Sequence, residues 1–184
     1  VSPATTSETL SEMERRDWLE VEGAGPAKMR RLRERGPVLD EWARLIADQK
    51  QPRIQRFYVP GGDAGEIARR LDEACHDVGA QYAVTAEAAA QAYAPYLSAI
   101  SQLRCRIQGG RLYSEVLSRL DARPVPEGWN LGVIEETGKS DIAVGERIDG
   151  IAYAPPVQVY LDLLQGSGRA REMADHLRAE RLSG

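Results

Sequence analysis

The residues best suited to chemistry lie near the start of the chain, and they offer hydrogen bonds and positive charge. The first group carries side-chain oxygens and consists of Ser2, Thr5, Ser7, Glu8 and Thr9. The second group consists of the cations Lys28, Arg30, Arg31, Arg33 and Arg35, which are opposed only by Glu34. Hydroxyls can bond to bases or phosphates, a carboxylate can accept from cytosine, and cations bind phosphate. Together the two groups predict contact with double-stranded DNA.

A short helix is expected to carry the first group. Ser2-Pro3 is a strong helix start, with serine as the N-cap and proline at the first helical position. Thr6, Leu10 and Met13 follow at helical spacing, which predicts a narrow buried face. The helix is expected to end near residue 16.

A β-hairpin is expected to carry the second group. Residues 18–21 alternate between apolar and polar side chains, residues 23–26 read as a turn, and residues 28–32 form the return strand. In that strand Lys28 and Arg30 share one face, while Arg31, Arg33 and Arg35 tend to the other. A helix followed by a basic hairpin is the order of a recognition helix and wing in a winged helix-turn-helix, which reads the major groove and the adjacent backbone.

Taken one feature at a time, an ordinary surface helix and a solvated arginine run would explain this segment. The ordered combination favours DNA contact. The chain begins with Val1 rather than an initiator methionine, inside this motif, so we expect the sequence to be part of a longer protein. Residues 1–36 are therefore interpreted as the C-terminal part of a winged-helix domain.

Strands and helices alternate over the remaining residues, 37–184, and predict an α+β or α/β domain. The expected helices cover residues 38–48, 63–78, 85–93, 112–120, 155–164 and 170–181, with Asp63 and Thr85 as N-caps. The expected strands cover residues 53–59, 81–84, 103–107, 130–135 and 141–144, with a short one at 151–152.

The composition limits the class of protein. The net charge of −4 excludes a uniformly basic surface but leaves room for a local basic patch. Two cysteines, Cys75 and Cys105, are too few for a disulfide framework and suit the reducing cytoplasm. No apolar run approaches the length of a membrane span, and no signal peptide is visible. We expect a cytoplasmic protein with no membrane partner.

Catalytic and metal-binding alternatives are weaker. Residues 138–140 (Gly-Lys-Ser) imitate a phosphate-binding loop, but the required earlier glycine is Val133. Carboxylates near strand ends could be imagined to hold a metal, as in a degenerate nucleotidyltransferase or nuclease: Glu135, Glu136, Asp141 and Asp149. They lack the spacing of either enzyme class, so we expect no metal and no cofactor.

Three further features are expected to be structural. Cys75 and His76 are adjacent in a helix and cannot face each other as a nucleophile and its base. Arg169 and Arg171 could contact an anion, although solvent exposure is the safer interpretation. Four tyrosines could line a pocket but are more often core residues on helices: Tyr93, Tyr96, Tyr153 and Tyr160.

The sequence resembles two known patterns. Residues 1–14 resemble the recognition helix of many bacterial winged-helix repressors. The rest of the chain resembles the AbiEi family of antitoxins, which are transcriptional regulators of type IV toxin–antitoxin systems. The segments that carry this second resemblance are residues 56–60 (RFYVP), 82–90 (YAVTAEAAA), 154–164 (APPVQVYLDLL), 168–172 (GRARE) and 176–178 (HLR).

This resemblance implies a winged helix that binds inverted repeats in its own promoter. It also implies a C-terminal domain tied to antitoxin action. The toxin would be a nucleotidyltransferase-like protein that is countered without a stable complex. We therefore expect a non-enzymatic, autoregulating DNA-binding regulator. The alternatives are a protein-interaction module and a degenerate nucleotidyltransferase-like or nuclease-like enzyme.

Overall fold

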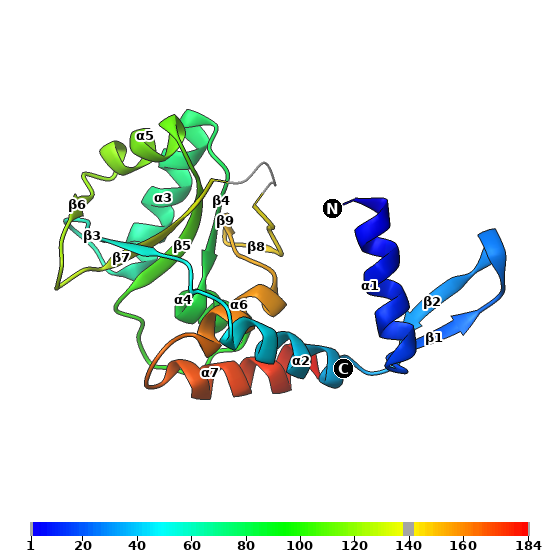
Figure 1. Cartoon of the computed structure of the whole chain (residues 1–184). Coiled ribbons are helices and arrows are strands. Elements are labelled where there is room, and N and C mark those ends of the chain that lie inside the picture. Colours follow the sequence, from blue (N-terminus) through cyan, green and yellow to red (C-terminus); the bar gives the residue numbers. More distant parts are fainter. Residues whose placement is uncertain (1, 138–141, 184) are drawn as a thin grey trace. The chain divides into compact units, whose positions relative to one another are not determined.

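The computed structural model describes residues 2–137 and 142–183, and the chain divides into two compact units (Figure 1). One unit spans residues 2–48 and the other Gln49–Leu182. The division falls after Asp48 and not between residues 36 and 37, where we expected a domain boundary. The helix after the hairpin therefore groups with the N-terminal unit.

The N-terminal unit is a helix, a hairpin and a second helix. Its elements are α1 (Pro3–Arg15), β1 (Leu19–Glu22), the 3₁₀ turn η1 (Gly25–Ala27), β2 (Met29–Leu32) and α2 (Arg35–Ala47). Ser2 caps α1, since its Oγ accepts a hydrogen bond from the Thr5 amide at 3.1 Å. The antiparallel strands pair from Leu19 with Leu32 to Glu22 with Met29. The predicted capped helix and hairpin are thus confirmed.

Two local predictions in this unit are wrong. Thr6 is exposed, and Leu10 and Met13 are only half-buried, because a hairpin of four-residue strands covers little of the helix it contacts. Arg35 begins α2 instead of continuing the wing strand. Pro37 lies in the first turn of α2, where its missing N–H would have no helical partner anyway.

The second unit is built on one five-stranded sheet with the strand order β4-β5-β7-β3-β6. Its strands are β3 (Ile54–Tyr58), β4 (Tyr82–Thr85), β5 (Leu103–Gln108), β6 (Arg123–Pro124) and β7 (Leu131–Glu136). β5 and β7 are parallel and the other pairs are antiparallel. A separate hairpin joins β8 (Arg147–Ile148) and β9 (Ile151–Ala152). This mixed sheet confirms the α+β class.

Helices cover the two faces of the sheet (Figure 1). On one face lie α3 (Ala64–Val78) and α5 (Arg111–Arg119), and on the other lie α4 (Ala86–Tyr93), α6 (Pro156–Leu164) and α7 (Ala170–Leu177), which continues into η2 (Arg178–Leu182). Side chains of β5 alternate between these two faces. Leu103, Cys105 and Ile107 are fully buried, whereas Arg104 and Arg106 point to the side of α4 and α6.

The two predicted helix caps of this unit behave differently. Asp63 caps α3 through an Oδ1 that accepts from the Glu66 amide at 2.9 Å, as expected. Thr85 occupies the N-cap position of α4, but its side chain makes no capping bond. Its hydroxyl donates instead to Asp162 of α6 at 2.5 Å, because both side chains are buried and the carboxylate needs a donor.

The strand expected at residues 141–144 is not formed over the described part, residues 142–144. The Ile142 amide donates to the side-chain oxygen of Gln81 at 3.1 Å rather than to a neighbouring strand. The local pairing occurs a few residues later, where Ile148 pairs with Ile151 in the β8–β9 hairpin.

Candidate nucleic-acid interface

The N-terminal half of α1 presents an exposed row of side-chain oxygens. Every described residue from Ser2 to Thr9 is exposed. Ser2 and Thr5 share a hydrogen bond between hydroxyls at 2.8 Å, and the Thr9 hydroxyl donates to the Thr5 carbonyl at 2.9 Å. Each hydroxyl keeps a free lone pair or its own hydrogen for an outside partner. The row is therefore held in place by the helix and still open on its outer side.

Helical geometry divides the five predicted residues of α1 into two sides. Ser2, Thr5, Glu8 and Thr9 follow spacings of three and four and share one face. Ser7 is two residues from Thr5, which turns its side chain by about 160° to the far side of the helix. One DNA groove could meet the first four but not Ser7 at the same time.

Glu14 joins the hairpin to α1. Its Oε2 accepts from Lys28 Nζ at 2.7 Å and its Oε1 accepts from Arg30 Nε. These bonds from Lys28 and Arg30 hold the pKa of Glu14 below its usual value. Since both cations reach the same carboxylate, Lys28 and Arg30 lie on one side of the hairpin as predicted, although Lys28 directly precedes β2.

The remaining predicted cations are more open. Arg33 donates to Asp17 at 3.1 Å, and Arg31 lies opposite Glu20 in the hairpin register. Arg31 and Arg35 are exposed and make no ion pair with any residue that the structure describes. The structure thus separates Lys28 and Arg30, which are part-buried against Glu14, from Arg33, whose pair with Asp17 is exposed, and from Arg31 and Arg35, which pair with no described carboxylate.

A second ion-pair group connects α1 with α2. Arg16 donates to Glu12 at 2.6 Å and to Glu41 at 2.9 Å, and its guanidinium lies 5.0 Å from the centre of the Trp18 ring. Arg44 and then Arg16 lower the pKa of Glu41 to about 2. This group joins the C-terminal end of α1 to α2 through solvent-exposed ion pairs.

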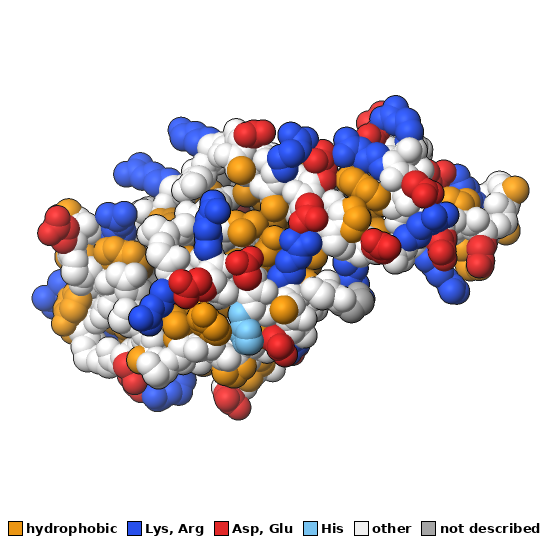
Figure 2. Space-filling view, turned by 90° about the horizontal axis from the view of Figure 1, so that it is seen from below, with side chains coloured by type: hydrophobic (Ala, Val, Ile, Leu, Met, Phe, Trp, Pro, Cys, Tyr) orange, Lys and Arg blue, Asp and Glu red, His pale blue; other side chains and the backbone are white. Residues whose placement is uncertain are grey.

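The charge around this interface is mixed. Residues 1–48 contain eight lysines and arginines against ten aspartates and glutamates. Figure 2 shows cations interleaved with acids over the visible face, without an extended field of one sign. Affinity for a phosphate backbone must therefore come from a few placed cations and not from a general positive potential.

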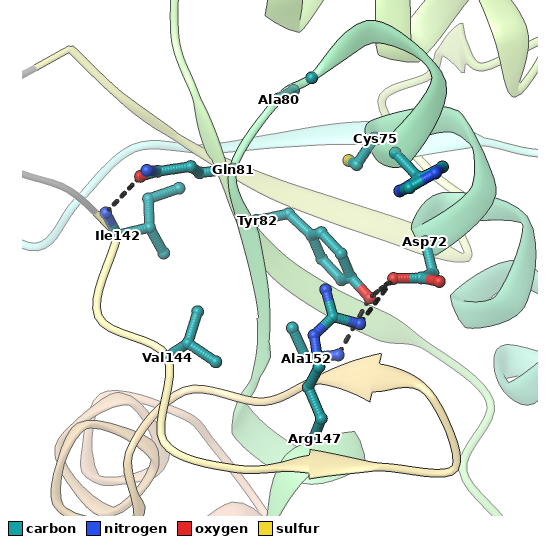
Figure 3. A pocket seen from close by; sticks show the side chains of 11 residues that line it. Asp72, Cys75, Ala80, Gln81, Tyr82, Ile142, Val144, Arg147 and Ala152 are labelled. Carbon is teal, nitrogen blue, oxygen red and sulfur yellow. Dashed lines mark hydrogen bonds and ion pairs between the residues drawn. The ribbon is translucent and has the colours of Figure 1, made fainter.

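A cavity of about 320 Å³ lies beside α3 and β4 in the second unit (Figure 3). Its polar groups bond to one another: Tyr82 donates to Asp72 at 2.8 Å and accepts from the Ala152 amide at 3.0 Å, and Arg147 donates to Asp72 at 3.1 Å. Burial raises the pKa of Cys75, which also lines the cavity, to about 12. A thiol in that state is not a nucleophile at neutral pH, which agrees with the structural role expected for Cys75.

Two of the four carboxylates considered for a metal, Glu135 and Glu136, have protein partners. Glu135 accepts from Gln55 at 3.2 Å and from the Gly110 amide at 3.1 Å, and Glu136 pairs with Arg106. Asp149 is exposed in a turn. Among the residues described by the structure, no group of three or more His, Cys, Asp or Glu side chains could hold a metal ion. Asp141 and the Gly-Lys-Ser segment at 138–140 lie outside the described residues.

The four tyrosines make separate structural contacts. Tyr93 donates to the Ala154 carbonyl at 2.9 Å and packs edge-on against Tyr153. Tyr160 receives a bond from Arg178 at 3.2 Å, and Tyr96 stacks near His176. Arg169 and Arg171, the second anion contact considered, are exposed and make no ion pair with a described residue.

Sequence reasoning missed the most heavily bonded polar group of the second unit, Asp162. This buried carboxylate accepts from Thr85, from Arg106 at 2.7 and 3.3 Å, and from Gln158 at 2.8 Å. It joins β4, β5 and α6. The available signal was the spacing of Gln158 and Asp162, which lie one helical turn apart on an otherwise apolar helix.

Residues 31–183 match the family model described as "Transcriptional regulator, AbiEi antitoxin, Type IV TA system". Because the match covers most of the chain, the chain belongs to the AbiEi family, a family of antitoxins and transcriptional regulators. No curated protein and no solved structure matches the chain significantly. The matched residues include all of the second unit but leave α1 and β1 outside.

Over residues 2–137 and 142–183, none of the helices has the length and apolar character needed to cross a bilayer.

Proposed function

We propose that the chain regulates transcription by binding double-stranded DNA through α1 and the hairpin. The observation that carries this proposal is the exposed row of oxygens on Ser2, Thr5, Glu8 and Thr9, on a helix to which Glu14 fixes a hairpin. A helix that is exposed along its N-terminal half and flanked by a fixed hairpin is the arrangement with which winged helices enter a major groove.

The two parts of the interface have different tasks. The α1 face reads bases, with hydroxyls that donate or accept and with Glu8 accepting from cytosine. The N-terminal end of the helix adds a positive partial charge for phosphate. Arg31, Arg33 and Arg35 neutralise the adjacent backbone.

In this proposal Lys28 and Arg30 mainly hold the hairpin against α1 through Glu14. Both are bonded to Glu14, so a phosphate would have to displace that carboxylate to reach them. Their contribution to DNA affinity is then smaller than the sequence alone predicts.

Membership of a family of type IV toxin–antitoxin regulators supports a role for this activity in a toxin–antitoxin operon. We infer that the DNA is an inverted repeat in the promoter of the chain's own gene, so that the regulator represses itself. The nucleotidyltransferase-like toxin would be countered without a stable complex. These finer roles rest on the family and on the interface geometry, and no catalytic step is part of them.

The test is a binding titration of the whole chain against a labelled duplex from the region upstream of its gene, with a random duplex of equal length beside it. Thr5→Ala combined with Thr9→Ala should reduce affinity for the upstream duplex about tenfold or more. Ser7→Ala is the matched control on the far side of the helix, and it should bind as the parent does.

The charge prediction uses a second pair of variants. Arg31→Gln should weaken binding to both duplexes equally and reduce the salt slope by about one. The control Arg171→Gln, an exposed arginine in the second unit, should change neither. Equal affinity of the unmodified chain for upstream and random DNA would disprove sequence-specific regulation by this chain.

One observation favours the protein-interaction alternative. Trp42 and Leu45 lie one turn apart on α2 and are each 47% exposed. Such neighbouring apolar side chains are typical of a contact surface. Recovery of a neighbouring gene product with the chain, lost on Trp42→Ala, would support that role over DNA binding alone.

A further inference from the structure

One half of the sheet in the second unit has an exposed face built from cations and aromatic rings. Phe57 pairs with Leu131 and both are buried, so the alternate residues of β3, Arg56 and Tyr58, point to the opposite face. The register places Tyr58 beside Arg123 of β6. α4 and α6 pack against β4 and β5 on this same side, and they leave Arg56 and Tyr58 exposed.

Trp129 lies on this face as well. A Cβ added to Gly132 would come within 3.1 Å of both the Trp129 ring and Cγ2 of Ile54, and 3.2 Å of Cγ of Arg104, so the indole and Ile54 share the space above the glycine. The Arg56 guanidinium lies 5.9 Å from the centre of the Trp129 ring. Read across the sheet from β5 to β6, the side chains are Arg104, Trp129, Arg56, Tyr58 and Arg123, which we name the cation–aromatic strip.

The side chains of Arg56, Tyr58 and Arg123 in the strip are exposed to solvent. Tyr58 is 45% exposed and the Arg123 side chain 67% exposed. Arg56 makes no ion pair with any described carboxylate, and its one bond is a long contact of 3.5 Å to the Pro126 carbonyl. Arg104 is held by Glu87 and Arg123 by Asp121, so Arg56 is the cation available at the centre of the strip.

We propose that the cation–aromatic strip binds single-stranded nucleic acid. Unpaired bases can stack on Tyr58 and on the layer of Trp129 and Arg56, while the Arg56 guanidinium meets a phosphate. A duplex hides its base faces, so an open sheet with exposed rings selects single strands. Four neighbouring strands span about 14 Å, which is room for two or three bases.

This site is separate from the duplex interface of the N-terminal unit, and the two can fail independently. The direct test is fluorescence anisotropy of labelled oligouridine and oligothymidine with the whole chain at low salt. Tyr58→Ala should weaken binding about tenfold. Arg56→Gln should weaken it and lower the salt slope by about 0.7, the value for one phosphate on a single strand.

Matched controls use equally exposed residues elsewhere. Tyr96, 46% exposed, and Arg171 lie outside the strip, so Tyr96→Ala and Arg171→Gln should bind as the parent does. Trp18→Phe with Trp42→Phe leaves Trp129 as the only tryptophan, and its emission should be quenched by saturating oligouridine.

Three results would overturn the proposal: no binding of either oligonucleotide, equal losses in the strip variants and the controls, or unchanged Trp129 emission at saturation. If Tyr58→Ala instead abolishes contact with a co-purifying protein while oligonucleotides do not bind, the strip is a protein-docking surface and the proposal is wrong. Loss of duplex binding in the α1 variants with oligouridine binding intact would confirm that the sites are separate.

Discussion

Replacing Asp162 with asparagine tests whether the second unit depends on its buried ionic network. The carboxylate is 6% exposed and accepts from Thr85 at 2.5 Å, Arg106 at 2.7 Å and Gln158 at 2.8 Å. Asparagine keeps the shape but removes the charge and turns one acceptor into a donor. At least one of these donors then faces another donor in a buried place.

The magnitude follows from those contacts. A hydrogen bond to a charged group contributes about 1.5–3 kcal/mol, and an unsatisfied buried donor costs about 1–3 kcal/mol. Arg106 keeps its second partner, Glu136, which limits the loss. We expect Asp162→Asn to lower the free energy of unfolding by about 2–3 kcal/mol, which corresponds to a fall in Tm of about 5–10 °C.

The control is Glu136→Gln, which removes the other carboxylate that contacts the same arginine. The Glu136 side chain is 36% exposed, and water screens such a pair, so the cost should stay below about 1 kcal/mol. Urea unfolding followed by Trp129 emission, in the variant with phenylalanine at Trp18 and Trp42, reports the second unit alone. Equal costs for the two substitutions, or no cost for Asp162→Asn, would refute the reasoning.

Three other outcomes are expected. Arg44 and then Arg16 lower the pKa of Glu41 to about 2, so the stabilisation by the Glu41 carboxylate is complete above about pH 4.5 and is lost as the pH falls toward 2. In acid unfolding followed by circular dichroism, this loss of stability should be absent from Glu41→Gln. Cys75, which is buried with a pKa raised to about 12, should react with a thiol reagent only after unfolding in urea, and rapid labelling of the native chain would contradict its core position. Gly132→Ala places a methyl group 3.1 Å from both Trp129 and Ile54 and should destabilise the unit by about 1–3 kcal/mol while shifting the tryptophan emission. Unchanged emission would mean that the indole does not lie above residue 132.

The predictions from sequence held where the signal was local. Ser2 and Asp63 cap helices as expected, because a cap bonds to an amide only three residues away. The hairpin, most strands and the α+β class were also predictable from alternation and turn residues. The predicted cap at Thr85 was wrong because the Thr85 hydroxyl bonds to Asp162, a residue distant in the sequence that local patterns do not reveal.

The candidate interface was predictable in its parts but not in their arrangement. The sequence predicts that Lys28 and Arg30 lie on one side of the hairpin, and this is confirmed. It does not show that Glu14 engages both, since that contact requires the hairpin to fold back onto α1. Whether the outer face of α1 reads DNA remains a prediction.

By itself, the amino-acid sequence determined the helix starts, the strand pattern, the family and the residue types available for binding. The tertiary structure decided which cations are free and which polar groups are buried. It also decided that Trp129, Arg56 and Tyr58 lie on one face of a sheet. The physical reason is range: caps and turns are set by bonds within about four residues, whereas strand register and packing join residues that only the folded chain brings together.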